Sequence, residues 1–202
     1  MIESRRETEP LVRARYCQEW LDFVSKDDEP WRSRFLERIS PDLRATIEGT
    51  ARVAWAPLAI HVKLAEILVD AYGIQRAHAY YRRAFAASLR GPVLGPLSQS
   101  AARLFRITPG TFARWASRGY EASFKHAGFV VGQELGPGRA RIEYRDLPGI
   151  ATGSEAWLQS AHGSAYGAFD FLRVDGIARI DLSGRRAGRL RLDFEWAVPA
   201  SA

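Results

Sequence analysis

The hydrophobic pattern of this chain changes its period between residues 122 and 127, and that change limits the fold more than any other feature. Before it, apolar residues recur at helical spacing, as in Leu11, Cys17, Leu21 and Val24. After it, charged and apolar residues alternate, as in residues 139–145 and 189–196. Helices followed by amphipathic strands predict an α+β fold, in which an N-terminal helical layer precedes a β-β-α-β-β antiparallel sheet.

Capping and turn residues divide the first half into helices. The predicted segments are 11–24, short helices beginning at Pro30 and at Ser40-Pro41, 57–72 ending at Gly73, 74–89 ending at Gly91-Pro92, 94–105, and a last helix from Thr108-Pro109 to Glu121. Cys17 lies on the apolar face of the first segment, so we expect it in the core.

The second half contains two predicted hairpins with a helix between them. Residues 136–138 turn the chain between strands 129–135 and 139–147, and residues 183–188 do so between strands 177–182 and 189–196. The intervening segment 154–169 is predicted as a helix, in which Gly163 and Gly167 stand four apart. These glycines permit close packing against a neighbouring element, which we favour, or leave room for a ligand.

The length of 202 residues predicts one domain over 1–202, with a helical half at 10–122 and a sheet half at 127–197. The net charge of +6 comes from 26 arginines and three lysines spread along the chain, which favours a mixed, solvated surface over a nucleic-acid-binding tract. A single cysteine precludes an intramolecular disulfide and suggests a reducing compartment. Since no apolar run has transmembrane length, we expect a cytoplasmic protein without a membrane span.

Three stretches carry a resemblance to known domains. They are Thr108-Pro109-Gly110 with a helix running into the first hairpin, the glycine-rich helix around residues 161–167, and the closing strand 190–196. In this layout the chain resembles a myxobacterial family of unknown function related to the ligand-binding domains of nitric-oxide signalling and Golgi transport. That wider group includes haem-nitric-oxide-binding domains, vinyl-reductase-type domains and trafficking-particle subunits.

The resemblance implies a sensory or regulatory domain, without enzymatic activity, that holds a small apolar ligand or an acyl chain of a lipid. The pocket would lie between helix 154–169, the sheet and region 115–124. Its predicted lining is aromatic and consists of Trp115, Phe124, Phe129, Trp157, Tyr166 and Phe169. Relatives that dimerise through their helical layers suggest a homodimer, and a protein-interaction or scaffold module remains an alternative.

The sequence offers few residues for cofactor or catalytic chemistry. Relatives that bind haem carry a Tyr-x-Ser-x-Arg motif, which this chain lacks, and it has none of the C-terminal cysteines of the vinyl-reductase-type domains. Its four histidines lack metal-ligand spacing, and His61 and His78 are expected on helix surfaces. Nucleophile-elbow and phosphate-loop motifs are absent too. We therefore predict no catalytic residues, no metal site and no cofactor.

The main alternative function is DNA binding by residues 100–119, which resemble a helix-turn-helix unit. Its second helix would present Thr111, Arg114 and Arg118 to DNA, with Arg103 and Arg106 on the same exposed face. Two core helices leading into the sheet explain the same residues, and we favour that interpretation because helix pairs joined by a turn are common in proteins that do not bind DNA.

Overall fold

The computed structural model describes residues 8–90 and 108–198. The helical half contains β1 (Leu11–Arg13), α1 (Ala14–Val24), α2 (Trp31–Leu36), α3 (Pro41–Gly49), β2 (Trp55–Pro57), α4 (Leu58–Tyr72) and α5 (Ile74–Arg90). The second part contains α7 (Pro109–Ser123), β3 (Phe124–Lys125), β4 (Phe129–Gly136), β5 (Arg139–Arg145), α8 (Gly149–Gly153), α9 (Glu155–Leu172), β6 (Gly176–Asp181), the 3-10 turn η1 (Arg185–Ala187) and β7 (Leu190–Trp196). The α+β prediction is confirmed, and the predicted helix 94–105 lies outside the described residues.

The predicted capping residues begin two of these helices. Ser40 accepts a hydrogen bond from the backbone N–H of Leu43 at the start of α3, and Thr108 accepts one from Thr111 at the start of α7. Ser154 similarly caps α9 by accepting from the backbone N–H of Trp157. Each cap satisfies a backbone donor that would otherwise lack a partner in the first helical turn.

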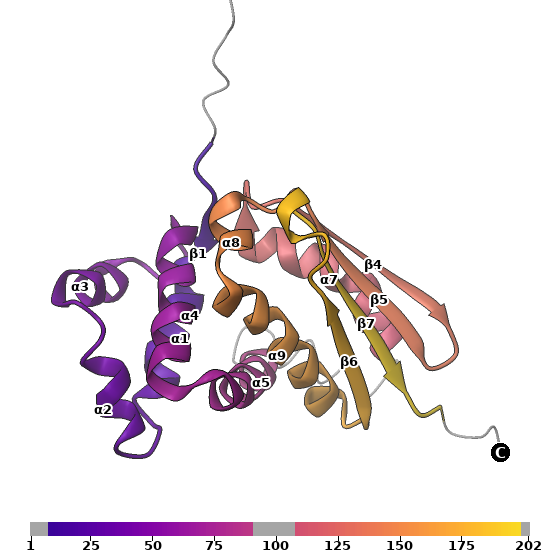
Figure 1. Ribbon diagram of the computed structural model, residues 1–202, viewed down its shortest axis with the longest axis horizontal. Helices are drawn as coiled ribbons and strands as arrows, with labels where there is room; N and C mark the ends of the chain where they lie inside the picture. The colour runs from indigo at the N-terminus through magenta and orange to yellow at the C-terminus, as the bar shows by residue number, and fades with distance from the viewer. Residues whose placement is uncertain (1–7, 91–107, 199–202) are drawn as a thin grey trace, which may run out of the picture.

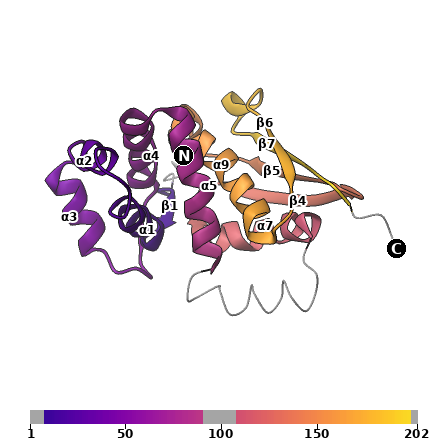
Figure 2. The ribbon, with the colours of Figure 1, turned by 90° about the horizontal axis from the view of Figure 1, so that it is seen from below.

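The two predicted hairpins form one antiparallel sheet with strand order β4-β5-β7-β6. Helices α7 and α9 pack on the same face of this sheet, α7 over β4 and β5 and α9 over β6 and β7 (Figures 1 and 2). Because side chains alternate along a strand, the opposite face carries the charged members of the pattern. Three ion pairs cross it, joining Arg141 to Asp193, Arg179 to Glu195 and Arg191 to Asp181.

A second, three-stranded sheet with order β2-β1-β3 joins the helical half to the start of the first hairpin. Its central strand corrects the prediction that residues 11–13 form the first turn of a helix. Val12 is fully buried there and pairs with both Ala56 and Phe124. Tertiary pairing on both sides of β1 therefore overrides the local helical spacing.

The two glycines of α9 serve helix packing. A Cβ atom on Gly163 would lie 2.7 Å from the Cβ of Tyr81, and one on Gly167 would lie 2.5 Å from the carbonyl oxygen of Arg82. Both contacts are with α5, so the absent side chains let the two helices approach closely. Arg82 also forms an ion pair with Asp170 of α9. Of the two interpretations of these glycines, the packing role is the one that the structure supports.

Candidate functional site

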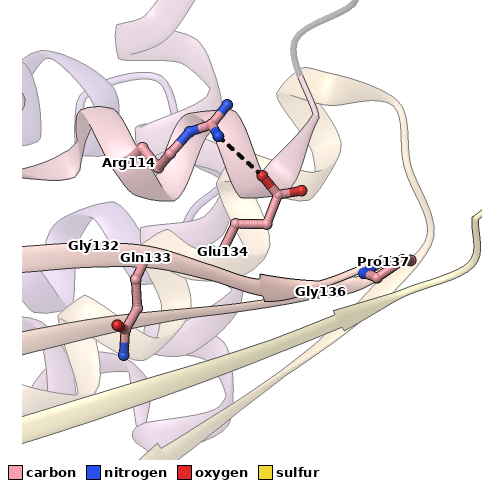
Figure 3. A pocket seen from close by; sticks show the side chains of 6 residues that line it. All are labelled: Arg114, Gly132, Gln133, Glu134, Gly136 and Pro137. Atoms are coloured by element: carbon pink, nitrogen blue, oxygen red, sulfur yellow. Dashed lines mark ion pairs between the residues drawn. The ribbon is translucent and has the colours of Figure 1, made fainter.

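An open groove of about 700 Å³ lies between α7 and the β4–β5 hairpin. Figure 3 shows Arg114 reaching from α7 toward Glu134 of β4, with the hairpin turn at one end. The lining residues are Arg114, Gly132, Gln133, Glu134, Gly136 and Pro137. Its volume lies within the range of about 300–1,000 Å³ that is typical of ligand pockets, and three of its side chains, those of Arg114, Gln133 and Glu134, are polar.

Arg114 is the cationic group of this groove. Its Nη1 atom lies 3.2 Å from Oε2 of Glu134, and its Nη2 atom donates a hydrogen bond of 3.1 Å to the hydroxyl of Thr111. These contacts use only part of the fork of N–H donors that a guanidinium carries. Because the Arg114 side chain is about half exposed (56%), a further anionic group can reach the remaining donors.

Two glycines allow α7 to lie directly against β4. A Cβ atom on Gly132 would stand 1.7 Å from the carbonyl oxygen of Ala113, so the backbones of helix and strand touch at that point. A Cβ atom on Gly110 would stand 2.6 Å from the Glu134 carboxyl carbon. Neither glycine was predicted to bring the helix against the strand, although a glycine inside a strand pattern is a signal for close backbone approach.

The interior between α4 and α9 is built from aromatic rings around His61. Contrary to the expectation of a helix-surface position, His61 is buried, and its Nδ1 accepts a hydrogen bond of 3.1 Å from the indole N–H of Trp157. Its ring centroid lies 4.4 Å from that of Trp20. Burial lowers the pKa of His61 to about 4, so the imidazole is neutral at pH 7 and serves as an acceptor for Trp157.

The six aromatic residues predicted to line a pocket occupy different environments. Trp157 and Phe169 are buried in the core, while Phe124 and Tyr166 are half-buried against it. Two contacts join them, one between the rings of Phe124 and Trp157 and one between those of Tyr166 and Phe169. The remaining two, Trp115 and Phe129, are 46% and 42% exposed. The prediction that they hold a ligand stays untested.

His78, His162 and Cys17 also pack against other parts of the fold. His162 lies with its ring centroid 4.7 Å from that of His78, and its Nε2 atom is 2.9 Å from the carbonyl oxygen of Ala178. Cys17 is buried, which raises the pKa of its thiol to about 12 and keeps it protonated. Within residues 8–90 and 108–198, no three histidine, cysteine or acidic side chains are placed to hold a metal ion.

The residues of the DNA-binding alternative are only partly placed for that role. Arg118 is exposed, Arg114 is paired with Glu134, and Thr111 is half-buried and holds the Arg114 side chain. Arg103 and Arg106 lie outside the described residues, so a continuous basic face across all four arginines has no support here.

None of the helices within the described ranges has the length and apolar character of a membrane span.

The structure is similar to solved H-NOX domains over nearly its whole length. The Fe(II) unliganded form of a mutant H-NOX protein from K. algicida matches with a TM-score of 0.62 at 10% identity, covering 93% of this chain and 97% of that one. A mutant of the T. Tengcongensis H-NOX matches with a TM-score of 0.57 at 8% identity, covering 94% and 100%. A structure from a study of heme distortion in the H-NOX family has a TM-score of 0.61 at 8% identity, covering 94% and 97%.

The sequence by itself does not place the chain in a family. No family model matches the chain, and no curated protein matches it significantly. Since identities of 8–10% carry information about architecture and not about the groups in a site, the similarity extends to the backbone arrangement only. This chain therefore has an H-NOX-like fold.

Proposed function

We propose that this chain is a non-catalytic sensory or regulatory domain that binds a small ligand in the groove between α7 and β4. The observation that carries the proposal is the placement of Arg114 in that groove, half exposed and with donors to spare. A ligand with an anionic or hydrogen-bonding group suits this lining better than the apolar molecule or lipid predicted from the sequence, because an apolar ligand would leave the polar groups of Arg114, Gln133 and Glu134 without partners.

Neither the groove nor the aromatic interior around His61 fits haem, the group named for one of the structural neighbours. Haem iron takes its protein ligand from His, Cys, Met or Tyr, and none of these lines the groove. In the interior, Nδ1 of His61 is engaged by Trp157 and its ring packs against Trp20. Seating a porphyrin there would require these aromatic side chains to leave the core, so no role is assigned to haem.

The absence of catalysis is proposed because neither Cys17, the candidate nucleophile, nor His61, the candidate base, is in a reactive state. At neutral pH the buried Cys17 is a thiol and not the reactive thiolate, and His61 is enclosed away from solvent. In the groove, Arg114 and Glu134 are paired with each other, which suits ligand recognition. A binding domain explains this arrangement with fewer assumptions than an enzyme.

The proposal is tested by screening anionic metabolites and short peptides for thermal stabilisation of the purified chain. A ligand of the groove should lose its effect in Arg114→Met and keep it in Arg118→Met. Arg118 is the matched control because it lies one turn further along α7 and does not line the groove. Binding that is equal in both variants, or no ligand from any class, would refute the proposal.

A further inference from the structure

We infer that the ligand of this groove is a short extended peptide that adds as an antiparallel strand to the open edge of β4. The inference rests on the proposed function, since it names the ligand class of the same groove. The groove is lined by residues 132–134 and 136 of β4 and by Pro137 of the turn that follows, together with Arg114 of α7. It therefore follows the edge of the sheet, between the strand and the helix (Figure 3).

The register shows which backbone groups face this edge. The backbone N–H of Trp196 donates to the carbonyl of Gly138, so the even-numbered residues of β5 bond to β7. In an antiparallel ladder the hydrogen-bonded positions alternate, so the odd-numbered residues of β5 form their hydrogen bonds with β4. Their partners in β4 are Phe129, Val131 and Gln133. The even-numbered residues of β4 must point their N–H and C=O groups away from the sheet.

Two even positions, Gly132 and Glu134, line the groove and thus present peptide groups to it. Among the described residues, no backbone group outside the sheet forms a hydrogen bond with theirs. β4 is an edge strand with β5 as its neighbour, and an extended peptide is the partner that pairs such a row of donors and acceptors.

The side chains beside the edge select the sequence of that peptide. On the outer face, Phe129, Val131 and Leu135 are all exposed apolar residues, at 42%, 36% and 40%. A peptide residue beside them gains from being apolar. On the inner face, the half-exposed guanidinium of Arg114 can donate to a second carboxylate in addition to that of Glu134. Alternating apolar and acidic residues match both faces at once.

A peptide fits this edge better than the β4 strand of a second copy. A symmetric β4 pair would bring α7 of both copies to one seam, and with it the cation Arg114 of each copy. The peptide meets Arg114 with acidic side chains instead. Since β4 has eight residues, a strand paired with it is at most about 26 Å long. So short a strand buries a small area, as weak, transient interactions do.

The direct test uses a fluorescein-labelled peptide of alternating valine and glutamate, seven residues long, in a fluorescence anisotropy titration with the full chain. In the inferred pairing the glutamates face Arg114, and their N–H groups donate to β4, while the valine N–H groups face solvent. N-methylation of the three glutamates should weaken binding at least tenfold, whereas N-methylation of three valines should change it less than about twofold.

A variant pair tests the same contact from the protein side. Glu134→Pro removes an N–H that faces the groove and leaves the bonds to β5 intact, because proline is tolerated at such edge positions. It should bind the peptide several-fold more weakly than Glu134→Ala, which lacks the carboxylate but keeps the N–H. Circular dichroism of both variants would check that the sheet is retained.

The outcomes separate the inference from the proposed function. If the two N-methylated peptides bind equally, or if an Arg114-dependent small molecule binds and no peptide does, the strand pairing is refuted while the groove remains a binding site. If no ligand of any class depends on Arg114, both are refuted. A concentration-dependent dimer that Glu134→Pro dissociates would replace the peptide with a second copy of the chain.

Discussion

His61 should make the stability of this fold sensitive to mild acid. Its Nδ1 accepts from the indole of Trp157, and its side chain is enclosed by aromatic rings. Protonation would place a second donor opposite the indole N–H and would charge a buried ring. For this reason the pKa falls from 6.5 to about 4 in the folded state.

The size of the effect follows from linkage. Between pH 6.5 and pH 4 the unfolded chain binds a proton at His61 that the folded chain does not bind, so stability falls as the pH falls through this window. Relative to pH 7, this single group removes about 2 kcal/mol at pH 5 and about 3 kcal/mol at pH 4. Its contribution is constant above the unfolded pKa and levels off below pH 4.

The assay compares the wild type with His61→Asn in urea titrations at pH 7, 6, 5 and 4, followed by circular dichroism. Asparagine offers Oδ1 in place of Nδ1 to Trp157 and does not titrate. Carboxylates affect both proteins equally, so the difference between them isolates His61. The variant should lose stability at pH 7 and recover about 2 kcal/mol relative to wild type by pH 5. A difference that does not change with pH would show that His61 does not carry this pH dependence.

Three further predictions concern packing, reactivity and charge. Gly163→Ala should lower the free energy of unfolding by about 1–3 kcal/mol, because its Cβ would meet Tyr81, whereas Gly119→Ala, with open space around it, should be neutral or stabilising in the same urea titration. Cys17 should react with a thiol reagent such as DTNB only in urea, and rapid labelling of the native chain would contradict its burial. A double-mutant cycle on the partly exposed pair Arg82 and Asp170 should give a coupling of about 0.5–1 kcal/mol that decreases as salt is added, and a larger, salt-independent value would contradict this estimate.

The sequence predicted the large sheet because its strands have one buried and one solvated face. Residues 139–145 and 190–196 alternate in the printed sequence as their side chains alternate in the structure. The small sheet could not be predicted in the same way, because β1 and β2 have three residues each and β3 has two, which is too short for a period. Their formation depends on pairing between segments far apart in the chain.

The candidate site was harder to predict from the sequence than the large sheet. The contact between Arg114 and Glu134 depends on how α7 docks on β4, and only Gly132, inside a strand pattern, gave a local signal of that docking. The burial of His61 had a clearer signal, since α4 is apolar around most of its circumference and such a helix is enclosed by neighbours. A histidine on it is more readily buried than exposed.

The most direct test of the groove is a two-dimensional NMR titration of the ¹⁵N-labelled chain with its best-binding ligand. The backbone amides of Gly132 and Glu134, which face the groove, should shift first, and those around Trp157 and Phe169 should not move. Shifts confined to the core around Trp157 and Phe169 would contradict this prediction and would place the ligand in the interior aromatic pocket that the sequence predicted.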